Sequence, residues 1–220
     1  MIFEEKSNQV SNYLKNRIAE GEHQTQDFKY AITDSRKIAR TLAAFANTDG
    51  GRLLVGVKDN GRVAGVSSDE EYYMVEAAAK MYCKPPVKFK TNTHKYEGKT
   101  VLEVIVPKSS DKPHKAPTKD GSYKVYVRVN DQNLLANGIL LKVWARQKKE
   151  EGTLLKITQA QNLLLSYLNE HRDITLSGFQ KLAGIKRWTA EQIIINLLVI
   201  NVLEMQLSET QCVYRIKPVG

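Results

Sequence analysis

The pattern of hydrophobic and polar residues near position 40 predicts a helix followed by a buried strand. Ser35 can cap this helix. Its apolar stripe has three- and four-residue spacing and consists of Ile38, Leu42 and Phe45. Gly50-Gly51 then permits backbone conformations that a Cβ would forbid, so the chain can reverse. The run 53–57 is apolar on both faces, which predicts a central strand covered on both sides.

Apolar residues spaced three and four apart predict helices, and apolar residues at every second position predict strands, in the rest of the first 150 residues. Asn60-Gly61 is the strongest short hairpin signal, and the prolines of residues 108–120 argue against regular structure there. Helices are expected at 5–20, 69–82 and 134–150, and strands at 25–30, 87–96, 100–106 and 122–129. A short charged linker follows at 148–152, so we expect a first domain at residues 1–150.

Residues 151–220 show a different order of elements and form a second expected domain. The spacing predicts helices at 158–171, 175–183 and 188–199, then a hairpin that pairs 203–205 with 213–216. Three helices followed by a two-stranded ribbon is the order of a winged helix-turn-helix domain, which this part of the chain resembles by pattern.

The charge of the chain indicates a polyanionic partner. The formal net charge is +9, and positive charge near phosphates raises affinity by releasing counterions. Residues 152–220 hold seven Lys or Arg against five Asp or Glu, and the preceding residues hold 26 against 19. Most of the excess therefore belongs to the first expected domain.

Composition argues against a membrane protein. The chain is 42% hydrophobic but has no run of about eighteen apolar residues, and its first residues lack a signal-peptide pattern. Cys83 and Cys212 have neither a metal-binding nor a redox spacing, which favours reduced structural thiols. We therefore expect a cytoplasmic protein.

Three motifs in order resemble the Schlafen/AlbA-like family. They are Glu22 with Asp27-Phe28-Lys29, then Ala-Phe-Ala-Asn-Thr-Asp-Gly-Gly at 44–51, then Val-Gly-Val-Lys-Asp-Asn-Gly at 55–61. The resemblance covers roughly residues 20–145. It implies a compact α/β nucleic-acid-binding domain with a mixed sheet. Together with the small winged helix-turn-helix domain expected after it, the fold class is α+β. The family includes bacterial transcriptional regulators and eukaryotic Schlafen nucleases.

The resemblance also implies a candidate metal and catalytic site at Glu22, Asp27 and Asp59, where Schlafen-type nucleases keep three carboxylates. Clustered carboxylates can bind Mg²⁺ or Mn²⁺, which activates water and stabilises charge on a phosphate. Two residues depart from the family pattern, because Lys58 replaces an Asp and His23 replaces a Ser. The alternative interpretation makes the three carboxylates solvated or salt-bridged structural groups.

A basic stretch in the first domain provides the candidate nucleic-acid contacts. These are Lys112, Lys115, Lys119, Lys124 and Arg128. Tyr123 and Tyr126 lie among them and can stack on bases or sugars if they face outward. The alternative is a solvated loop.

The start of the third helix of the second domain provides further candidates. Lys186, Arg187 and Gln192 are types of residue that reach phosphates and base edges. Glu191 lies on the same turn, and the run 193–200 is strongly apolar. These two features support a protein interface as well as the basic residues support nucleic-acid contact.

The sequence therefore predicts a cytoplasmic protein that binds DNA or RNA and regulates transcription, with a homodimer as a candidate assembly. Two other classes stay open. One is a metal-dependent endoribonuclease that uses the three carboxylates. The other is an adaptor that dimerises through the second domain.

Overall fold

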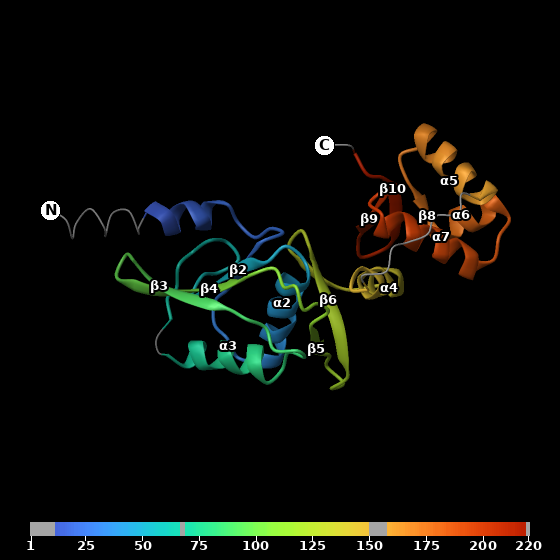
Figure 1. Ribbon diagram of the computed structural model, residues 1–220. Helices are drawn as coiled ribbons and strands as arrows, with labels where there is room; N and C mark the ends of the chain where they lie inside the picture. The colour runs from blue at the N-terminus through green and yellow to red at the C-terminus, as the bar shows by residue number, and fades with distance from the viewer. Residues whose placement is uncertain (1–11, 67–68, 150–157, 219–220) are drawn as a thin grey trace. The chain divides into compact units, whose positions relative to one another are not determined.

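A computed structural model describes residues 12–66, 69–149 and 158–218 of the chain (Figure 1). The chain divides into two compact units, residues 1–136 and residues 137–220. Each unit has its own hydrophobic core.

The first unit is built around a mixed four-stranded sheet, within the described residues, of order β1-β2-β4-β3. Its strands are β1 (Gln26–Lys29), β2 (Gly51–Val55), β3 (Lys90–Tyr96) and β4 (Lys99–Val106). β1 runs parallel to β2, and the other neighbours are antiparallel. This arrangement confirms the expected α+β class.

Helices cover both faces of this sheet (Figure 1). On one face, α2 (Ser35–Asn47) and α3 (Glu70–Lys80) pack on Leu53, Val55 and the alternate residues of β4 in the larger core. On the other face, Leu14 of the helical residues 12–19 packs on Phe28 and Leu54 in a smaller core. The strand at 51–55 is therefore buried on both sides, as its apolar run predicts.

The structure corrects the predicted cap of α2 and shows why a glycine follows this helix. Asp34, rather than Ser35, caps α2, and its side chain accepts a hydrogen bond from the backbone N of Arg36. Gly50 has a φ of +76°, and a Cβ there would lie 2.8 Å from the backbone of Lys108 and Val106. Only glycine fits this close approach.

A second sheet, which the sequence analysis largely missed, packs against α2. It has the order β5-β6-β7 and consists of β5 (Lys115–Pro117), β6 (Tyr123–Val129) and β7 (Gln132–Leu135). The prediction of irregular structure throughout 108–120 was therefore wrong, because β5 pairs with β6 despite its proline. The helix expected from residue 134 starts later, at Gly138, because Leu134 and Leu135 belong to β7.

The second unit contains helices and a small antiparallel sheet of order β8-β10-β9. Its elements are α4 (Gly138–Gln147), α5 (Gln159–Glu170), β8 (Ile174–Thr175), α6 (Leu176–Ala183), α7 (Arg187–Val199), β9 (Leu203–Leu207) and β10 (Cys212–Ile216). Thr158 and Thr175 cap α5 and α6, and Gly184 ends α6 in a left-handed conformation. The three helices and the hairpin predicted for this region are confirmed.

The boundary between the units lies about one helix earlier than the expected boundary at residue 150. Ile139 and Val143 of α4 belong to the core that α7 also lines, so α4 is part of the second unit. With the boundary at 136/137, the first unit holds 22 Lys or Arg against 17 Asp or Glu, and the second holds 11 against 7. The positive excess is therefore shared almost equally, which corrects its assignment to the first domain.

In the described part of the chain, no helix has the length and apolar character needed to cross a lipid bilayer.

Candidate nucleic-acid interface

Four exposed lysines from three segments of the first unit form a candidate interface, here called the loop lysine surface. Its members are Lys84, Lys88, Lys108 and Lys115. They come from the loop after α3, the loop after β4 and the strand β5. The loop lysine surface is thus assembled by the fold and is not a single run of sequence.

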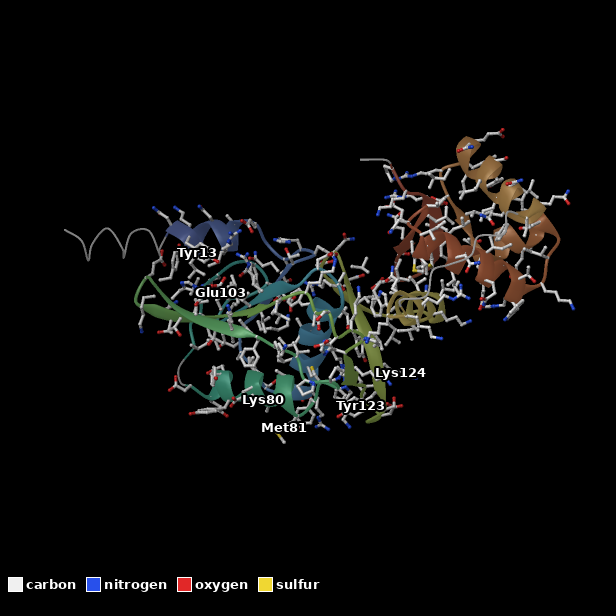
Figure 2. The ribbon with its side chains drawn as sticks, viewed as in Figure 1. Tyr13, Lys80, Met81, Glu103, Tyr123 and Lys124 are labelled. Atoms are coloured by element: carbon white, nitrogen blue, oxygen red, sulfur yellow. The ribbon has the colours of Figure 1, made fainter. Side chains whose placement is uncertain are left out.

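Backbone and side-chain contacts connect these segments. The backbones of Lys84 and Lys115 exchange two hydrogen bonds, of 2.9 and 2.7 Å. Lys84 Nζ lies 4.1 Å from the ring centroid of Tyr123, next to Lys124 at the start of β6 (Figure 2). Lys88 and Lys108 line one small cavity. These contacts bring together the three chain segments that carry the exposed lysines.

The expected lysines have different environments. Lys115, Lys119 and Lys124 are exposed, as nucleic-acid contact requires. Lys112 is half-buried, and burial, followed by the nearby charge of Lys108, lowers its pKa. Lys115 pairs with Val125, and Ala116 with Lys124, so Lys115 and Lys124 lie on opposite faces of the second sheet. The stretch therefore does not form one continuous row.

Sequence analysis missed Lys84 and Lys88. Lys84 precedes Pro85-Pro86, and Lys88, which follows them, lies in the strand expected at 87–96. The available signal was a lysine on each side of two prolines, since prolines keep such a segment out of a helix and in an exposed loop.

Arg128 is a structural residue and not a nucleic-acid contact, which corrects its assignment. Its side chain is only 2% exposed. One guanidinium nitrogen donates to Asp27 Oδ1 at 3.2 Å and to the carbonyl oxygen of Gln26 at 3.0 Å, and another donates to Asn133. Tyr126, which was a candidate for base stacking, is also buried, in the larger core. Arg128 and Tyr126 are two residues apart on β6, so their side chains point to the same, buried face of the strand.

The structure brings Glu22 and Asp27 together near the start of β1. The backbone N of Phe28 donates to Glu22 Oε1 at 2.8 Å. Burial and the neighbouring Asp27 carboxylate raise the pKa of Glu22. Asp27 Oδ2 lies 2.9 Å from Lys29 Nζ, in an ion pair without hydrogen-bond geometry. Both oxygens of Asp27 thus already face a cationic side chain, from Arg128 and Lys29.

The predicted metal site at Glu22, Asp27 and Asp59 does not form. Among residues 12–66, 69–149 and 158–218, no three His, Cys, Asp or Glu side chains are placed to hold a metal ion. Asp59 lies exposed in the turn after β2. Because two cationic side chains neutralise Asp27, the donor set does not fit Mg²⁺ or Mn²⁺.

The Ala-Phe-Ala-Asn-Thr-Asp-Gly-Gly motif positions the loop lysine surface. The side-chain amide of Asn47 donates to the carbonyl oxygens of His114 and Tyr126, each at 2.8 Å. Its oxygen accepts from the backbone N of His114 at 2.7 Å. Thr48 Oγ1 accepts from the backbone N of Arg128. The end of α2 therefore fixes both the loop before β5 and the strand β6.

In the second unit, the start of α7 presents part of the expected contact set. Lys186 and Arg187 are exposed, and Trp188 is 71% exposed. Arg187 also forms an ion pair with Glu191. The side chain of Gln192, by contrast, accepts a hydrogen bond from Arg146 of α4.

The docking of α4 on α7 explains why Gln192 is engaged. Lys142 Nζ lies 2.6 Å from Glu191 Oε2, and Arg146 donates to both Gln192 and Asn196. Lys142 and Arg146 are four residues apart and therefore lie on the same face of α4. Gln192 is held by α4 in this structure, so its assignment as a base-reading residue is not supported.

The first unit is thus a mixed sheet covered by helices, with a basic surface anchored by the end of α2 and the turn after it. Residues 22–137 match the model of the family described as Schlafen, AlbA_2. The match covers more than half of the chain, and the protein belongs to this family. The match ends at the boundary of the first unit, so the second unit lies outside it.

Two solved structures are similar to the chain. One is the DIP2311 protein from Corynebacterium diphtheriae, with 18% identity and a TM-score of 0.47, over 74% of this chain and 39% of that one. The other is the N-terminal domain of a putative ATP-dependent DNA helicase RecG-related protein from Nitrosomonas europaea, with 24% identity and a TM-score of 0.39, over 59% of this chain and 95% of that one. The chain spans 39% of the length of the first structure. No curated protein matches the sequence.

Proposed function

We propose that this protein binds nucleic acid through the loop lysine surface of its first unit. The observation that carries the proposal is that contacts between three segments bring exposed lysines together, with Lys84 on the ring of Tyr123, which is half-exposed. Lysines neutralise phosphates, and an accessible aromatic ring can stack on a base or a sugar. Membership of the Schlafen, AlbA_2 family supports the proposal, because resemblance to that family implies a nucleic-acid-binding domain.

The second unit offers a second contact through the start of α7. Its helices and two-stranded ribbon follow the order of a winged helix-turn-helix domain, in which such a helix approaches nucleic acid. Lys186, Arg187 and Trp188 are the exposed residues there. A role in transcription regulation follows from this proposal, and homodimer formation stays a prediction.

The arrangement at β1 favours binding over metal-dependent cleavage. A nuclease site needs carboxylate oxygens free to coordinate a cation. Asp27 instead faces Arg128 and Lys29, and Asp59 is not grouped with it.

Removal of three lysines tests the proposal. In the Lys84→Ala/Lys88→Ala/Lys115→Ala variant, affinity for a fluorescent oligonucleotide should fall at least about tenfold at about 0.1 M salt, because three lysine side chains can no longer neutralise phosphates. Fluorescence anisotropy measures this affinity for single-stranded and duplex DNA and RNA of one sequence.

The matched control is Lys15→Ala/Lys37→Ala/Lys58→Ala, which removes the same charge from exposed positions outside the loop lysine surface. This variant should bind within about threefold of the wild type at the same salt concentration, since charges more than about 10 Å from the bound phosphates are largely screened at about 0.1 M salt. Equal decreases in affinity for both variants would show that only net charge matters and would contradict a defined interface.

A further inference from the structure

Ser109 and His114 form a nucleophile and base pair in the loop before β5. Ser109 Oγ lies 2.7 Å from His114 Nε2, and His114 Nδ1 lies 2.8 Å from the carbonyl oxygen of Pro85. A carbonyl oxygen can only accept, so Nδ1 carries the proton of the neutral ring. Nε2 then accepts from the Ser109 hydroxyl, which is the tautomer that a general base requires.

Both partners are held in place by the surrounding backbone. His114 is 2% exposed, and Asn47 hydrogen-bonds its backbone N and its carbonyl oxygen. The backbone N of Ser109 donates to the carbonyl oxygen of Ala46 at 2.8 Å. The backbone N of Asp111 donates to Ser109 Oγ at 3.0 Å. Ser109 Oγ thus has a fixed position and keeps a lone pair for attack.

A cavity of about 160 Å³ opens beside this pair. Its lining includes Ser109 and His114, the positively charged Lys88 and Lys108, and the neighbouring Ser110 and Asp111. The volume is below the range of about 300–1,000 Å³ of drug-sized ligand pockets, so the cavity admits only a small group. Positive charge beside it favours the oxyanion that develops when a carbonyl group is attacked.

We propose that Ser109 is a reactive nucleophile, with His114 as its general base, toward small acyl esters. Ser109 Oγ attacks the ester carbonyl carbon while its proton passes to His114 Nε2. The ester C–O bond breaks, and His114 returns the proton to the leaving alcohol. Water then attacks the acyl-serine carbonyl carbon while one of its protons passes to His114 Nε2. The bond between Ser109 Oγ and the acyl carbon breaks, His114 returns the proton to Ser109 Oγ, and the acid is released. This proposal does not rest on nucleic-acid binding, although Lys88 and Lys108 of the loop lysine surface line the cavity.

A fluorophosphonate probe tests the nucleophile on the full chain. Attack by Ser109 Oγ on phosphorus forms an O–P bond and expels fluoride, while His114 takes the proton. Intact mass spectrometry should show one adduct on the wild type, and peptide mapping should place it on Ser109. The Ser109→Ala variant should show no adduct at this position.

Two further variants separate reactivity from a structural role. Ser110→Ala, which alters the neighbouring hydroxyl of the same cavity, should react at the wild-type rate. His114→Asn keeps a side-chain donor for the carbonyl oxygen of Pro85 but removes the base, so labelling should slow about 100-fold. Circular dichroism spectra establish whether each variant is folded.

The proposal is overturned if the wild type stays unlabelled under conditions that label a serine protease completely. It is also overturned if Ser109→Ala is labelled as fast as the wild type. If His114→Asn does not fold, the comparison of Ser109→Ala with Ser110→Ala decides, because both retain His114.

Discussion

At the scale of single residues, Arg128 shows why charge in a sequence is a poor guide to exposure. The alternating strand 122–129 correctly predicts β6, and four lysines precede Arg128 between residues 112 and 124. Its face of the strand, however, turns toward α2 and the start of β1, where carbonyl oxygens and the Asp27 carboxylate surround the guanidinium group. No local pattern contains this information, because Asp27 lies about one hundred residues away in the chain.

Arg128→Ala should lower the free energy of unfolding by about 3–5 kcal/mol, because the buried Asp27 carboxylate loses one of its two cationic partners and the carbonyl oxygens of Gln26 and His23 lose this donor. Urea denaturation at pH 7 measures this change. Lys124→Ala is the control, since it lies on the same strand and is exposed, and should change stability by about 0.5 kcal/mol or less. An Arg128→Ala variant as stable as this control would contradict the structural role of Arg128.

At the scale of elements, periodicity predicted the long helices and strands and missed the short strands. β5 and β7 contain only three and four residues, too few to show a period. Their existence depends on pairing with β6, which is a tertiary interaction. The helix α4 was predicted within 134–150, but its place in the second unit was not, because its partner α7 begins about forty residues after α4 ends. The candidate interface could likewise be predicted only in part, since Lys84 joins it through backbone hydrogen bonds with Lys115.

The helical residues 12–19 are held on the sheet by a buried polar cluster (Figure 2). Glu103 on β4 is fully buried, and it accepts hydrogen bonds from Tyr13 at 2.7 Å and Asn92 at 3.1 Å and lies 2.8 Å from His94 Nε2. Arg52 donates to the hydroxyl oxygen of Tyr13. Burial alone would raise the pKa of Glu103, but the hydrogen bonds from His94, Tyr13 and Asn92 outweigh it and lower the pKa below its usual value.

The stability that Glu103 contributes should therefore depend on pH. A carboxyl group with a lowered pKa stabilises the fold above its unfolded pKa of about 4.3, and this contribution disappears as the pH falls through the folded pKa. Glu103→Gln should be about 1–3 kcal/mol less stable at pH 7, and its deficit relative to the wild type should shrink below about pH 4. The pKa of Glu22 is raised, so its contribution to stability has the opposite pH dependence. Glu22 is present in both proteins, so its contribution cancels in the difference between them.

Urea denaturation of both proteins between pH 3 and 7 gives the difference. A deficit that is constant across this range would mean that the charge of Glu103 contributes nothing, which would contradict the assigned hydrogen-bond network.

At the scale of the whole molecule, the chain combines two basic units in one polypeptide. The first belongs to the Schlafen, AlbA_2 family and carries the loop lysine surface. The second lies outside the family match and carries Lys186 and Arg187 at the start of α7. The net charge of +9 is divided as +5 and +4 between them, so both units can contribute to attraction of a polyanion.

The salt dependence of oligonucleotide binding tests the central claim most directly. The logarithm of the wild-type affinity should fall linearly with the logarithm of salt concentration, with a slope of about −3 or steeper. In the Lys84→Ala/Lys88→Ala/Lys115→Ala variant the slope should weaken by about 2–3, because each lysine that neutralises a phosphate contributes about one to it. A wild-type affinity that does not change with salt, or a slope that is identical in the two proteins, would contradict phosphate binding by the loop lysine surface.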